Sequence, residues 1–399
     1  MNATRPGGVT DHRVPYGFRI DDFFDLEGWK VVDLTAVPMA QVAACPADRT
    51  PLTTICELTS LERGTRVRIG CCPECGHISY VDRPTQEWIY RYYLETWDSP
   101  AERSAGEGMA AVADKAARAA DGTVHATVRL AKGLPIDRSQ PVCEIGCGYG
   151  TSLRQLASAE FTRLVGIEAS RHRADIASAA GFDVLTTPFE APETREALRA
   201  RGPFGLIFTF HALEHTYHPD AVFTAAAALQ EPGSHLIVSV PNQEGEPSMG
   251  VLMFLPHLHS FTAASLAGVA ARSGYDVADA SANTAKTLNM VFRRTASRAA
   301  AVAGPRDSVT RAVAKFVSGL ELDRARVGRR RLWWSRRGDI AGQVWVGPPS
   351  ALGERNWARF LDRGEIRRPR SVLVSNLRGA KSDAPLQIQF RGAAGLFFK

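Results

Sequence analysis

The sequence predicts an α/β protein built on a mainly parallel sheet with helices on both faces. From Pro141 onward, short apolar stretches alternate with stretches of helical character. The apolar stretches are continuous, which is typical of strands buried on both sides in a parallel sheet. A turn with glycine at positions 146, 148 and 150 follows the first of them. Ligands of such sheets bind beyond the carboxyl ends of the strands, so we expect the functional site there.

Each expected element follows from this pattern in chain order. Strands are predicted at residues 142–145, 164–168, 183–186, 204–210, 235–240, 275–280 and 288–293. The fourth strand is the most continuously apolar of these and is therefore expected to be central. Helices are predicted at residues 152–158, 171–180, 221–229 and 263–273.

The chain is expected to form three units, residues 1–100, 101–295 and 296–399, because 399 residues exceed one typical domain. The first unit contains a cysteine cluster and an aromatic segment at residues 88–97. Residues 101–132 are alanine-rich and free of proline, and they predict a long helix that Gly133-Leu134-Pro135 ends. The third unit has no periodicity from which a fold can be predicted.

The net charge of +6 is unevenly distributed. Residues 293–399 contain 23 Lys/Arg and 8 Asp/Glu, whereas the remainder contains 25 and 34. This asymmetry indicates an anionic partner, with a solvated arginine-rich surface as the alternative. No apolar run approaches the roughly 18 residues of a membrane span, and the N-terminus has no leader pattern, so a cytoplasmic protein is predicted.

The residues around the glycine turn predict the ligand that it binds. Glu144 precedes Gly146 by two residues, at the end of the predicted strand. The glycines let a ligand lie against bare backbone, and the following helix supplies free N–H groups. The carboxylate would repel a pyrophosphate, whereas S-adenosylmethionine carries an ammonium and a sulfonium and no phosphate. Dinucleotide-binding domains, the alternative, have the pattern Gly-x-Gly-x-x-Gly, in which the third glycine falls one residue later than Gly150.

The turn and the elements after it resemble class I S-adenosylmethionine-dependent methyltransferases over residues 140–295. Glu168 ends the second predicted strand, 24 residues after Glu144. Later features also fall in the order of that family: Phe189-Glu190, Leu213-Glu214-His215, Glu231-Pro232-Gly233, Pro241-Asn242 and His257-Leu258-His259-Ser260-Phe261-Thr262. The resemblance implies a Rossmann-like sheet of seven strands and methyl transfer from S-adenosylmethionine.

The same resemblance implies cofactor-binding roles for individual residues. Glu144 is expected near the methionine amino group, and Glu168 is expected to bind the ribose hydroxyls. Gly146, Gly148 and Gly150 are expected to pass beneath the cofactor. Phe189 and Glu190 are expected to contact the adenine, and His211 is expected near the methionine end.

Histidines are the candidate general bases, because a hydroxyl or carbon-acid acceptor must lose a proton. His215, His257 and His259 are the predicted catalytic residues. His257 and His259 alternate in a loop where the family builds its substrate wall, so an extended chain would point them to opposite sides. His215 could instead cap the following helix. The aromatic segment 88–97 is expected to cover the cofactor as a lid, with an amphipathic helix as the alternative.

The cysteine cluster predicts a metal site. Cys72 and Cys75 form a Cys-x-x-Cys turn followed by glycine, which lets two thiolates bind one ion. Cys45-Pro46-Ala47-Asp48 resembles a second such turn in which aspartate replaces the second cysteine. The arrangement is similar to the N-terminal zinc-binding segment of sugar C-methyltransferases. The resemblance implies structural zinc on Cys45, Cys72 and Cys75, and a metal-free remnant is the alternative.

The predicted function is methyl transfer to a small, anionic acceptor such as a sugar nucleotide or a secondary metabolite. Methylation of a polymer is the alternative: a surface polysaccharide, a lipid-linked glycan or a nucleic acid. A nucleic acid is disfavoured, since no Asn/Asp-Pro-Pro-Tyr/Phe motif follows the fourth strand. A non-catalytic scaffold that retains the fold is a further alternative, which the intact glycine turn and Glu168 disfavour.

Overall fold

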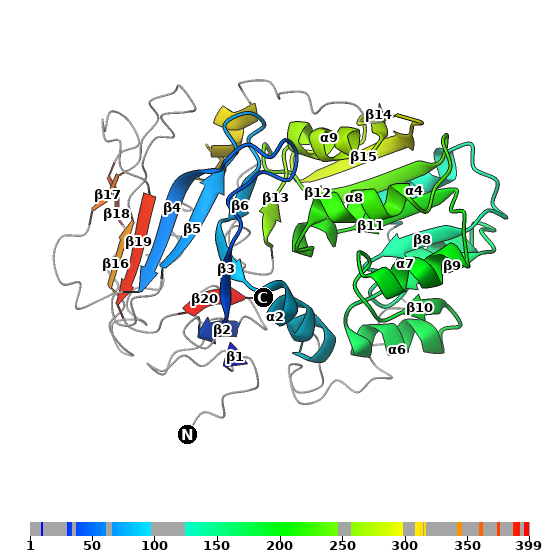
Figure 1. Cartoon of the computed structure of the whole chain (residues 1–399), viewed down its shortest axis with the longest axis horizontal. Helices are drawn as coiled ribbons and strands as arrows, with labels where there is room; N and C mark the ends of the chain where they lie inside the picture. Colours follow the sequence, from blue (N-terminus) through cyan, green and yellow to red (C-terminus); the bar gives the residue numbers. More distant parts are fainter. Residues whose placement is uncertain are drawn as a thin grey trace.

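The computed structural model describes residues 37–60, 66–96, 124–245, 257–297, 308–313 and 315–316, together with short strands nearer the two ends of the chain. Figure 1 shows two parts side by side: an α/β domain formed by residues 124–297 and a part rich in antiparallel strands. The predicted helix at residues 101–132 lies mostly outside the described residues, and its described portion begins at Ala126.

Seven strands form the sheet of the α/β domain, in the order β10-β9-β8-β11-β12-β15-β14. Neighbours run parallel from β10 to β12, whereas β15 is antiparallel to both β12 and β14. The strands are β8 (Val142–Ile145), β9 (Leu164–Ile167), β10 (Asp183–Leu185), β11 (Leu206–Phe210), β12 (His235–Pro241), β14 (Tyr275–Asp279) and β15 (Thr287–Arg294). This topology confirms the predicted fold class.

The order of the strands in the sheet determines where a ligand crevice can open. From β8 the chain proceeds outward through β9 and β10, then returns to add β11 on the other side of β8. The helices that follow β8 and β11 therefore leave in opposite directions, and a crevice opens between the carboxyl ends of these two strands. Continuous burial of β8 and β11, whose apolar residues pack on both faces, fixes this part of the sheet.

Helices cover both faces of the sheet. On one face α4 (Ala126–Gly133) and α5 (Thr151–Ala157) pack against Phe208 and Ile237. Apolar residues of three helices pack on the other: α7 (Pro192–Arg199), α8 (Pro219–Ala227) and α9 (Ala263–Arg272). A further helix, α6 (Arg171–Ala179), connects β9 to β10. The sequence pattern had not predicted α7, which begins at a proline, a residue preorganised for the first helical turn.

A second sheet joins segments that lie far apart in the chain. Its six strands have the order β13-β6-β5-β4-β19-β16. They are β4 (Thr53–Ser60), β5 (Arg66–Cys71), β6 (Ile78–Tyr80), β13 (His259–Ser260), β16 (Ala341–Val344) and β19 (Leu386–Arg391). The three units expected from the sequence thus contribute strands to one sheet.

Three smaller groups of strands accompany it. β3 (Met39–Gln41) pairs with β7 (Asp82–Pro84), and β17 (Arg359–Leu361) pairs with β18 (Leu373–Ser375). β2 (Lys30–Asp33) lies between β1 (Val9–Thr10) and β20 (Gly395–Phe398). The first and last strands of the chain therefore belong to one small sheet, on opposite sides of β2.

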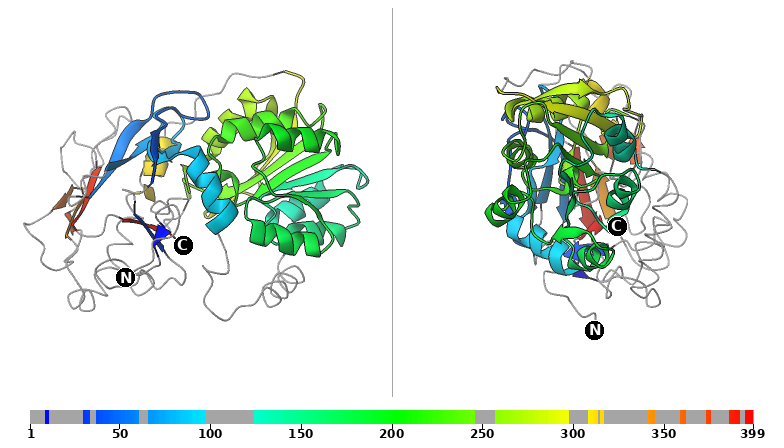
Figure 2. Two further views of the ribbon diagram at one scale, coloured as in Figure 1. Left: turned by 60° about the horizontal axis from the view of Figure 1, so that its bottom comes forward. Right: turned by 90° about the vertical axis from the view of Figure 1, so that its right-hand side faces the viewer.

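A helix leads from the second sheet to the α/β domain. It consists of α2 (Gln86–Arg91), capped by the hydroxyl of Thr85, and a π-helical turn, η2 (Tyr92–Thr96). Figure 1 and the left-hand view of Figure 2 place α2 at the junction of the two parts. Trp88 and Tyr92 stack with ring centroids 5.5 Å apart. None of the described helices is both long and apolar enough to cross a membrane.

Candidate functional site

An open cavity lies at the carboxyl ends of β8 to β11, where the sheet topology predicts it. Its floor comes from the strand ends and the turns that follow them, and its opposite wall comes from α2 and η2. The lining residues that carry the argument below are Tyr90, Tyr93, Gly146, Glu168, Phe189 and His215. Both parts of the molecule therefore contribute to one site.

The glycine turn passes close to the loop after β11. Gly146, Gly148 and Gly150 all have positive φ, of 74°, 54° and 78°, which explains why glycine occupies these positions. A Cβ atom at Gly146 would stand 2.4 Å from Cβ of Ala212, whereas one at Gly148 would meet no atom within 4 Å. Gly146 thus allows two loops to meet at the floor of the cavity.

Glu168 lines the cavity and also holds the glycine turn in place. Its carboxylate accepts hydrogen bonds from the backbone N–H of Gly148, at 2.7 Å, and of Ser170, at 2.8 Å. The acid at the end of the second strand therefore fixes the shape of the first turn. Phe189, Glu190 and His211 also line the cavity, as the cofactor assignment requires.

Glu144 is buried below this surface and does not line the cavity. Burial raises the pKa of its carboxyl group well above the usual range, although a hydrogen bond with Ser152 opposes the shift. Its Oε2 atom has no hydrogen-bond partner in the part of the chain that the structure describes. A positively charged ligand group beside the glycine turn, such as the ammonium of S-adenosylmethionine, would favour the ionised form of this carboxyl group and offset its burial.

Two tyrosines connect the helical wall to the α/β domain. The hydroxyl of Tyr90 donates to the carboxylate of Glu190. The hydroxyl of Tyr93 lies 2.8 Å from Nδ1 of His215. Tyr92, by contrast, is buried in the stack with Trp88. Two aromatic residues of this segment, Tyr90 and Tyr93, therefore line the cavity, and two others, Trp88 and Tyr92, stack in the core. The role of the segment as a lid over the cofactor stays a prediction, and Trp97 lies outside the described residues.

A carboxylate surrounded by histidines lies beside the cavity. Glu214 is 1% exposed and hydrogen-bonds through Oε1 with Nδ1 of His211, at 3.3 Å. His215 and His257 are adjacent, with ring centroids 4.5 Å apart. Burial alone would raise the pKa of Glu214, but the hydrogen bond from His211 and the proximity of His215 and His257 lower the pKa to about 2. Glu214 is therefore ionised at neutral pH.

His211 reaches the cavity from a strained position. Its φ angle is +52°, in the left-handed region, which costs a non-glycine residue roughly 1–2 kcal/mol. The backbone N–H of His211 is held by the carbonyl of Ser239 on the neighbouring strand β12. Strain of this kind is concentrated at functional sites, and here it turns the ring toward Glu214.

His259 occupies a different environment from His215 and His257. It is 3% exposed and outside the cavity lining. Nδ1 of His259 lies 3.0 Å from Nε2 of His77, and its Nε2 lies 3.2 Å from the guanidinium of Arg83. Burial, followed by the charge of Arg83, lowers the pKa of His259 well below its usual value. The structure thus separates His259 from the other two predicted catalytic residues, His215 and His257, and places it in a buried network with His77 and Arg83.

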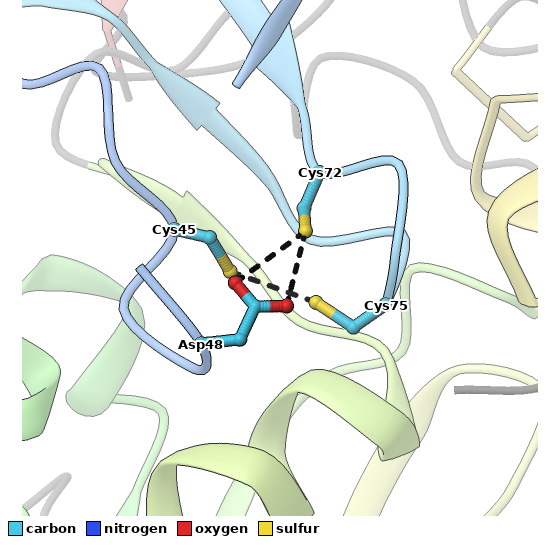
Figure 3. Close-up of side chains that lie close together, drawn as sticks. All are labelled: Cys45, Asp48, Cys72 and Cys75. Carbon is cyan, nitrogen blue, oxygen red and sulfur yellow. Dashed lines mark hydrogen bonds between the residues drawn. The ribbon is translucent and has the colours of Figure 1, made fainter. Parts of the chain in front are cut away.

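Two matching turns bring the cysteine cluster together (Figure 3). The N–H of Arg49 donates to the carbonyl of Cys45 at 2.9 Å, and the N–H of Gly76 donates to the carbonyl of Cys72 at 3.0 Å. Arg49 and Gly76 both have positive φ, of 68° and 74°. In each turn the first cysteine N–H is also bonded to the carbonyl five residues later. Asp48 therefore stands in the first turn where Cys75 stands in the second.

The four side chains of these turns fit a zinc ion. Their ligand atoms all lie within 4.8 Å of one another, and Sγ of Cys45 is 3.6 Å from Sγ of Cys75. Two thiolates on a tetrahedral zinc stand about 3.8 Å apart, given Zn–S bonds of about 2.3 Å. Hydrogen bonds from Cys45 and Cys75 lower the pKa of the Cys72 thiol to about 2. The set comprises the three predicted ligands, Cys45, Cys72 and Cys75, with Asp48 as the fourth.

The α/β domain also matches a known family. Residues 115–280 match the model of a family described as "Methyltransferase domain". With the topology and the acid-and-glycine site, this decides the identity of the domain. It is a class I S-adenosylmethionine-dependent methyltransferase domain. No curated protein matches the chain.

Solved structures similar to the methyltransferase domain include several methyltransferases. Magnesium protoporphyrin IX methyltransferase from Synechocystis PCC 6803 is 17% identical, with a TM-score of 0.36, and the match covers 53% of this chain and 97% of that one. The 1,6-didemethyltoxoflavin-N1-methyltransferase of Burkholderia thailandensis is 19% identical, with a TM-score of 0.34, over 50% and 93% of the two chains. At these values the likenesses say nothing about the acceptor of this protein.

Several site residues were not among those singled out from the sequence. Glu214 appeared there only as part of a family motif, and Tyr90 only within the aromatic segment. Arg83, which holds His259, carried no sequence signal, because its contact with His259 depends on the pairing of β6 with β13. His77 follows the Cys-x-x-Cys turn and was a further candidate metal ligand in the sequence, but it contacts His259 instead. Asp48 had a signal, its position in a Cys-x-x-Asp turn. Gly148 and Gly150 lie in the turn beside the cavity but do not line it.

Proposed function

We propose that this enzyme methylates a small-molecule acceptor bound between the tyrosines of the helical wall and the glycine turn. The observation that carries this proposal is that Tyr90 and Tyr93 face the same cavity as Gly146 and Glu168. A site covered by side chains from another part of the molecule encloses a small acceptor more readily than a polymer. A sugar nucleotide or a secondary metabolite is therefore the proposed acceptor class, and a cytoplasmic location is part of this proposal.

Bound S-adenosylmethionine would supply a methyl group already activated on a sulfonium. The residues of the protein have to align an acceptor nucleophile with it and exclude water, and such positioning accounts for much of the rate enhancement of bimolecular reactions. Gly146 and Glu168 shape the floor on which the cofactor would lie. Tyr90, held by Glu190, and Tyr93, held by His215, restrict the opposite side.

A proton acceptor is available beside this space. When a hydroxyl or carbon acid attacks the methyl group, the new bond forms as the carbon–sulfur bond breaks, and the acceptor's proton must pass to a base. His215 lines the cavity, and Glu214 beside it carries a negative charge that stabilises a protonated imidazole. His215 is thus the favoured base, and His257 supports it from the adjacent position.

We also propose that the acceptor is anionic, on the basis of the charged side chains that line the cavity. The cavity contains the cation Arg173, which lies over the ring of Tyr149 at 5.1 Å, and the carboxylates of Glu168 and Glu190. Arg173 would offer an anionic acceptor one charged partner. The basic residues of the last hundred positions would add to this attraction, but most of them lie outside the described residues.

We assign a structural role to zinc at Cys45, Asp48, Cys72 and Cys75. Methyl transfer from a sulfonium needs no Lewis acid, and the Oγ1 atom of Thr262 binds the carbonyl of Cys75 at 2.6 Å. An ion on these four side chains would therefore stiffen the support of the segment that carries His257 and His259. Elemental analysis of the purified protein tests this role, with about one zinc per chain as the expected result.

The function is tested by binding and by transfer. Calorimetry with S-adenosylmethionine should show one site per chain, and Glu168→Ala should weaken this binding by about 1–3 kcal/mol because charged hydrogen bonds are lost. Glu160→Ala, which removes an exposed carboxylate, is the matched control. Screening candidate acceptors for transfer of a labelled methyl group then identifies the substrate class. Absence of cofactor binding would favour the scaffold alternative, whereas transfer to a polymer alone would overturn the small-molecule proposal.

A further inference from the structure

The cluster of Glu214, His215 and His257 has the composition of a metal site. One ligand atom from each of the three residues lies within 4.8 Å of the other two. Glu214 is 1% exposed, and its Oε2 atom has no hydrogen-bond partner among the described residues. A buried carboxylate oxygen with an unused lone pair is costly unless a donor or a cation approaches it. His215 and His257 are each partly exposed, so the cluster is accessible from the cavity side.

We propose that Glu214, His215 and His257 bind a divalent transition-metal cation at the acceptor end of the cavity. Two imidazoles and one carboxylate form the ligand set of mononuclear sites that keep open coordination positions for substrate. Imidazole and carboxylate ligands accept Mn²⁺, Fe²⁺ and Co²⁺ as well as zinc, whereas the thiolates of Cys45, Cys72 and Cys75 select zinc over these hard cations. The two clusters of this chain therefore differ in chemistry as well as in position.

The surroundings of the three residues resemble the outer partners of known metal ligands. A metal-bound histidine usually uses its second ring nitrogen in a hydrogen bond that fixes its orientation. Nδ1 of His215 is bonded to the hydroxyl of Tyr93, so coordination would use Nε2. A ligating carboxylate is commonly hydrogen-bonded as well, and Oε1 of Glu214 is bonded to His211.

The inference rests on the proposed function, and it narrows the chemical class of acceptor that the site would take. His215 lines the cavity, so an acceptor there could coordinate the cation through oxygen atoms in the positions that the protein leaves open. A compound with two neighbouring oxygen donors would gain most, because it could occupy two positions at once. With the cation bound, His215 and His257 would serve as ligands, and the cation would lower the pKa of a coordinated acceptor hydroxyl, whose proton would pass to solvent.

Mn²⁺ is the appropriate probe, because thiolate sites bind it poorly and its electron paramagnetic resonance signal reports binding directly. Protein that carries one zinc per chain, and therefore zinc at the cysteine cluster alone, should bind one Mn²⁺ per chain. Glu214→Gln and His257→Ala should each weaken Mn²⁺ binding by more than about ten-fold, the loss that even an outer partner causes. His172→Ala, on α6 and outside both the cluster and the cavity lining, should leave the affinity unchanged.

Calorimetry with S-adenosylmethionine on the same variants separates the possible failures. Retained cofactor binding in Glu214→Gln or His257→Ala shows that the variant is folded. The Mn²⁺ affinity of a variant that still binds the cofactor then tests the proposal. Mn²⁺ affinity that is unchanged in a folded variant, or no Mn²⁺ binding by the parent protein, would overturn the metal site while leaving methyl transfer intact. Mn²⁺ binding that is lost in these variants, in a protein that transfers no methyl group, would instead overturn the proposed function alone.

Discussion

The hydroxyl of Tyr93 lies 2.8 Å from Nδ1 of His215, although 122 residues separate them in the chain. Tyr93 belongs to the helix that arrives from the antiparallel part of the molecule, and His215 follows a central strand of the methyltransferase domain. Burial raises the pKa of Tyr93 well above its usual value, so its hydroxyl keeps its proton at physiological pH. The contact therefore couples the position of the helical wall to the orientation of a candidate catalytic ring.

Tyr93→Phe should lower kcat by about ten-fold and change cofactor affinity little, because the ring remains while the group that orients His215 is lost. The loss of one buried hydrogen bond should also cost about 1 kcal/mol of folding stability. Tyr275→Phe is the matched control, since its hydroxyl donates to Gln230 outside the cavity. Steady-state kinetics with thermal unfolding checks both variants. An equal effect of the two substitutions on kcat would contradict the positioning role.

Gly146→Ala should abolish cofactor binding and destabilise the domain by about 2–5 kcal/mol. The new Cβ would stand 2.4 Å from Ala212, and the positive φ adds strain. Gly148→Ala has comparable backbone strain without the clash and should cost only about 1–2 kcal/mol. Denaturant unfolding and cofactor titration of the pair isolate the contribution of the contact. Similar losses in both variants would show that strain alone limits substitution here.

Asp48→Cys should increase zinc affinity, because it completes a set of four thiolates in a pair of turns whose backbones already match. Asp48→Ala should decrease zinc affinity. Competition with a chromophoric chelator measures both. Glu74→Ala is the control, since Glu74 is an exposed carboxylate within the second turn and outside the cluster. If Asp48→Ala retained the full zinc affinity, Asp48 would not be a ligand.

Folding stability should fall as the pH drops below about 6.5, in part through His259. Burial holds the pKa of His259 well below its unfolded value, so below pH 6.5 the unfolded chain takes up a proton that the folded chain does not. The stability contribution is thus present above the unfolded pKa and is lost as the pH falls, by up to about 1.4 kcal/mol per pH unit. His259→Gln should make unfolding free energies at pH 7 and pH 5 more alike. An unchanged difference would show that His259 is not responsible.

The sequence predicted the parts of this protein that depend on local pattern. Continuous apolar runs predicted the parallel strands, and the spacing of Glu144, Gly146 and Glu168 predicted a cofactor site at their ends. The strands alternate with helices along the chain, so each element and its neighbour could be recognised together. The pairing of the Cys45 and Cys72 turns was also accessible, because each turn has its own local signature.

Contacts between distant segments were not accessible in this way. Nothing in the residues near His259 indicates that it forms a strand beside β6, and its alternation with His257 predicted only that the two would face different directions. They do lie in different environments, but the decisive partner of His259, the buried guanidinium of Arg83, comes from 176 residues earlier. A guanidinium normally indicates an exposed position, so no local rule would have placed it in the core.

The pairing of β13 with β6 has a practical meaning for anyone who redesigns this enzyme. Residues 257–262 belong to the methyltransferase domain in sequence, but His259 and Ser260 form an edge strand of the other sheet, and Thr262 contacts the turn that carries Cys72 and Cys75. A catalytic core expressed from residue 124 onward would lack β6, the strand with which this segment pairs. Chimeras that exchange substrate preference between homologues should therefore transplant residues 37–96 and 257–262 as one cassette.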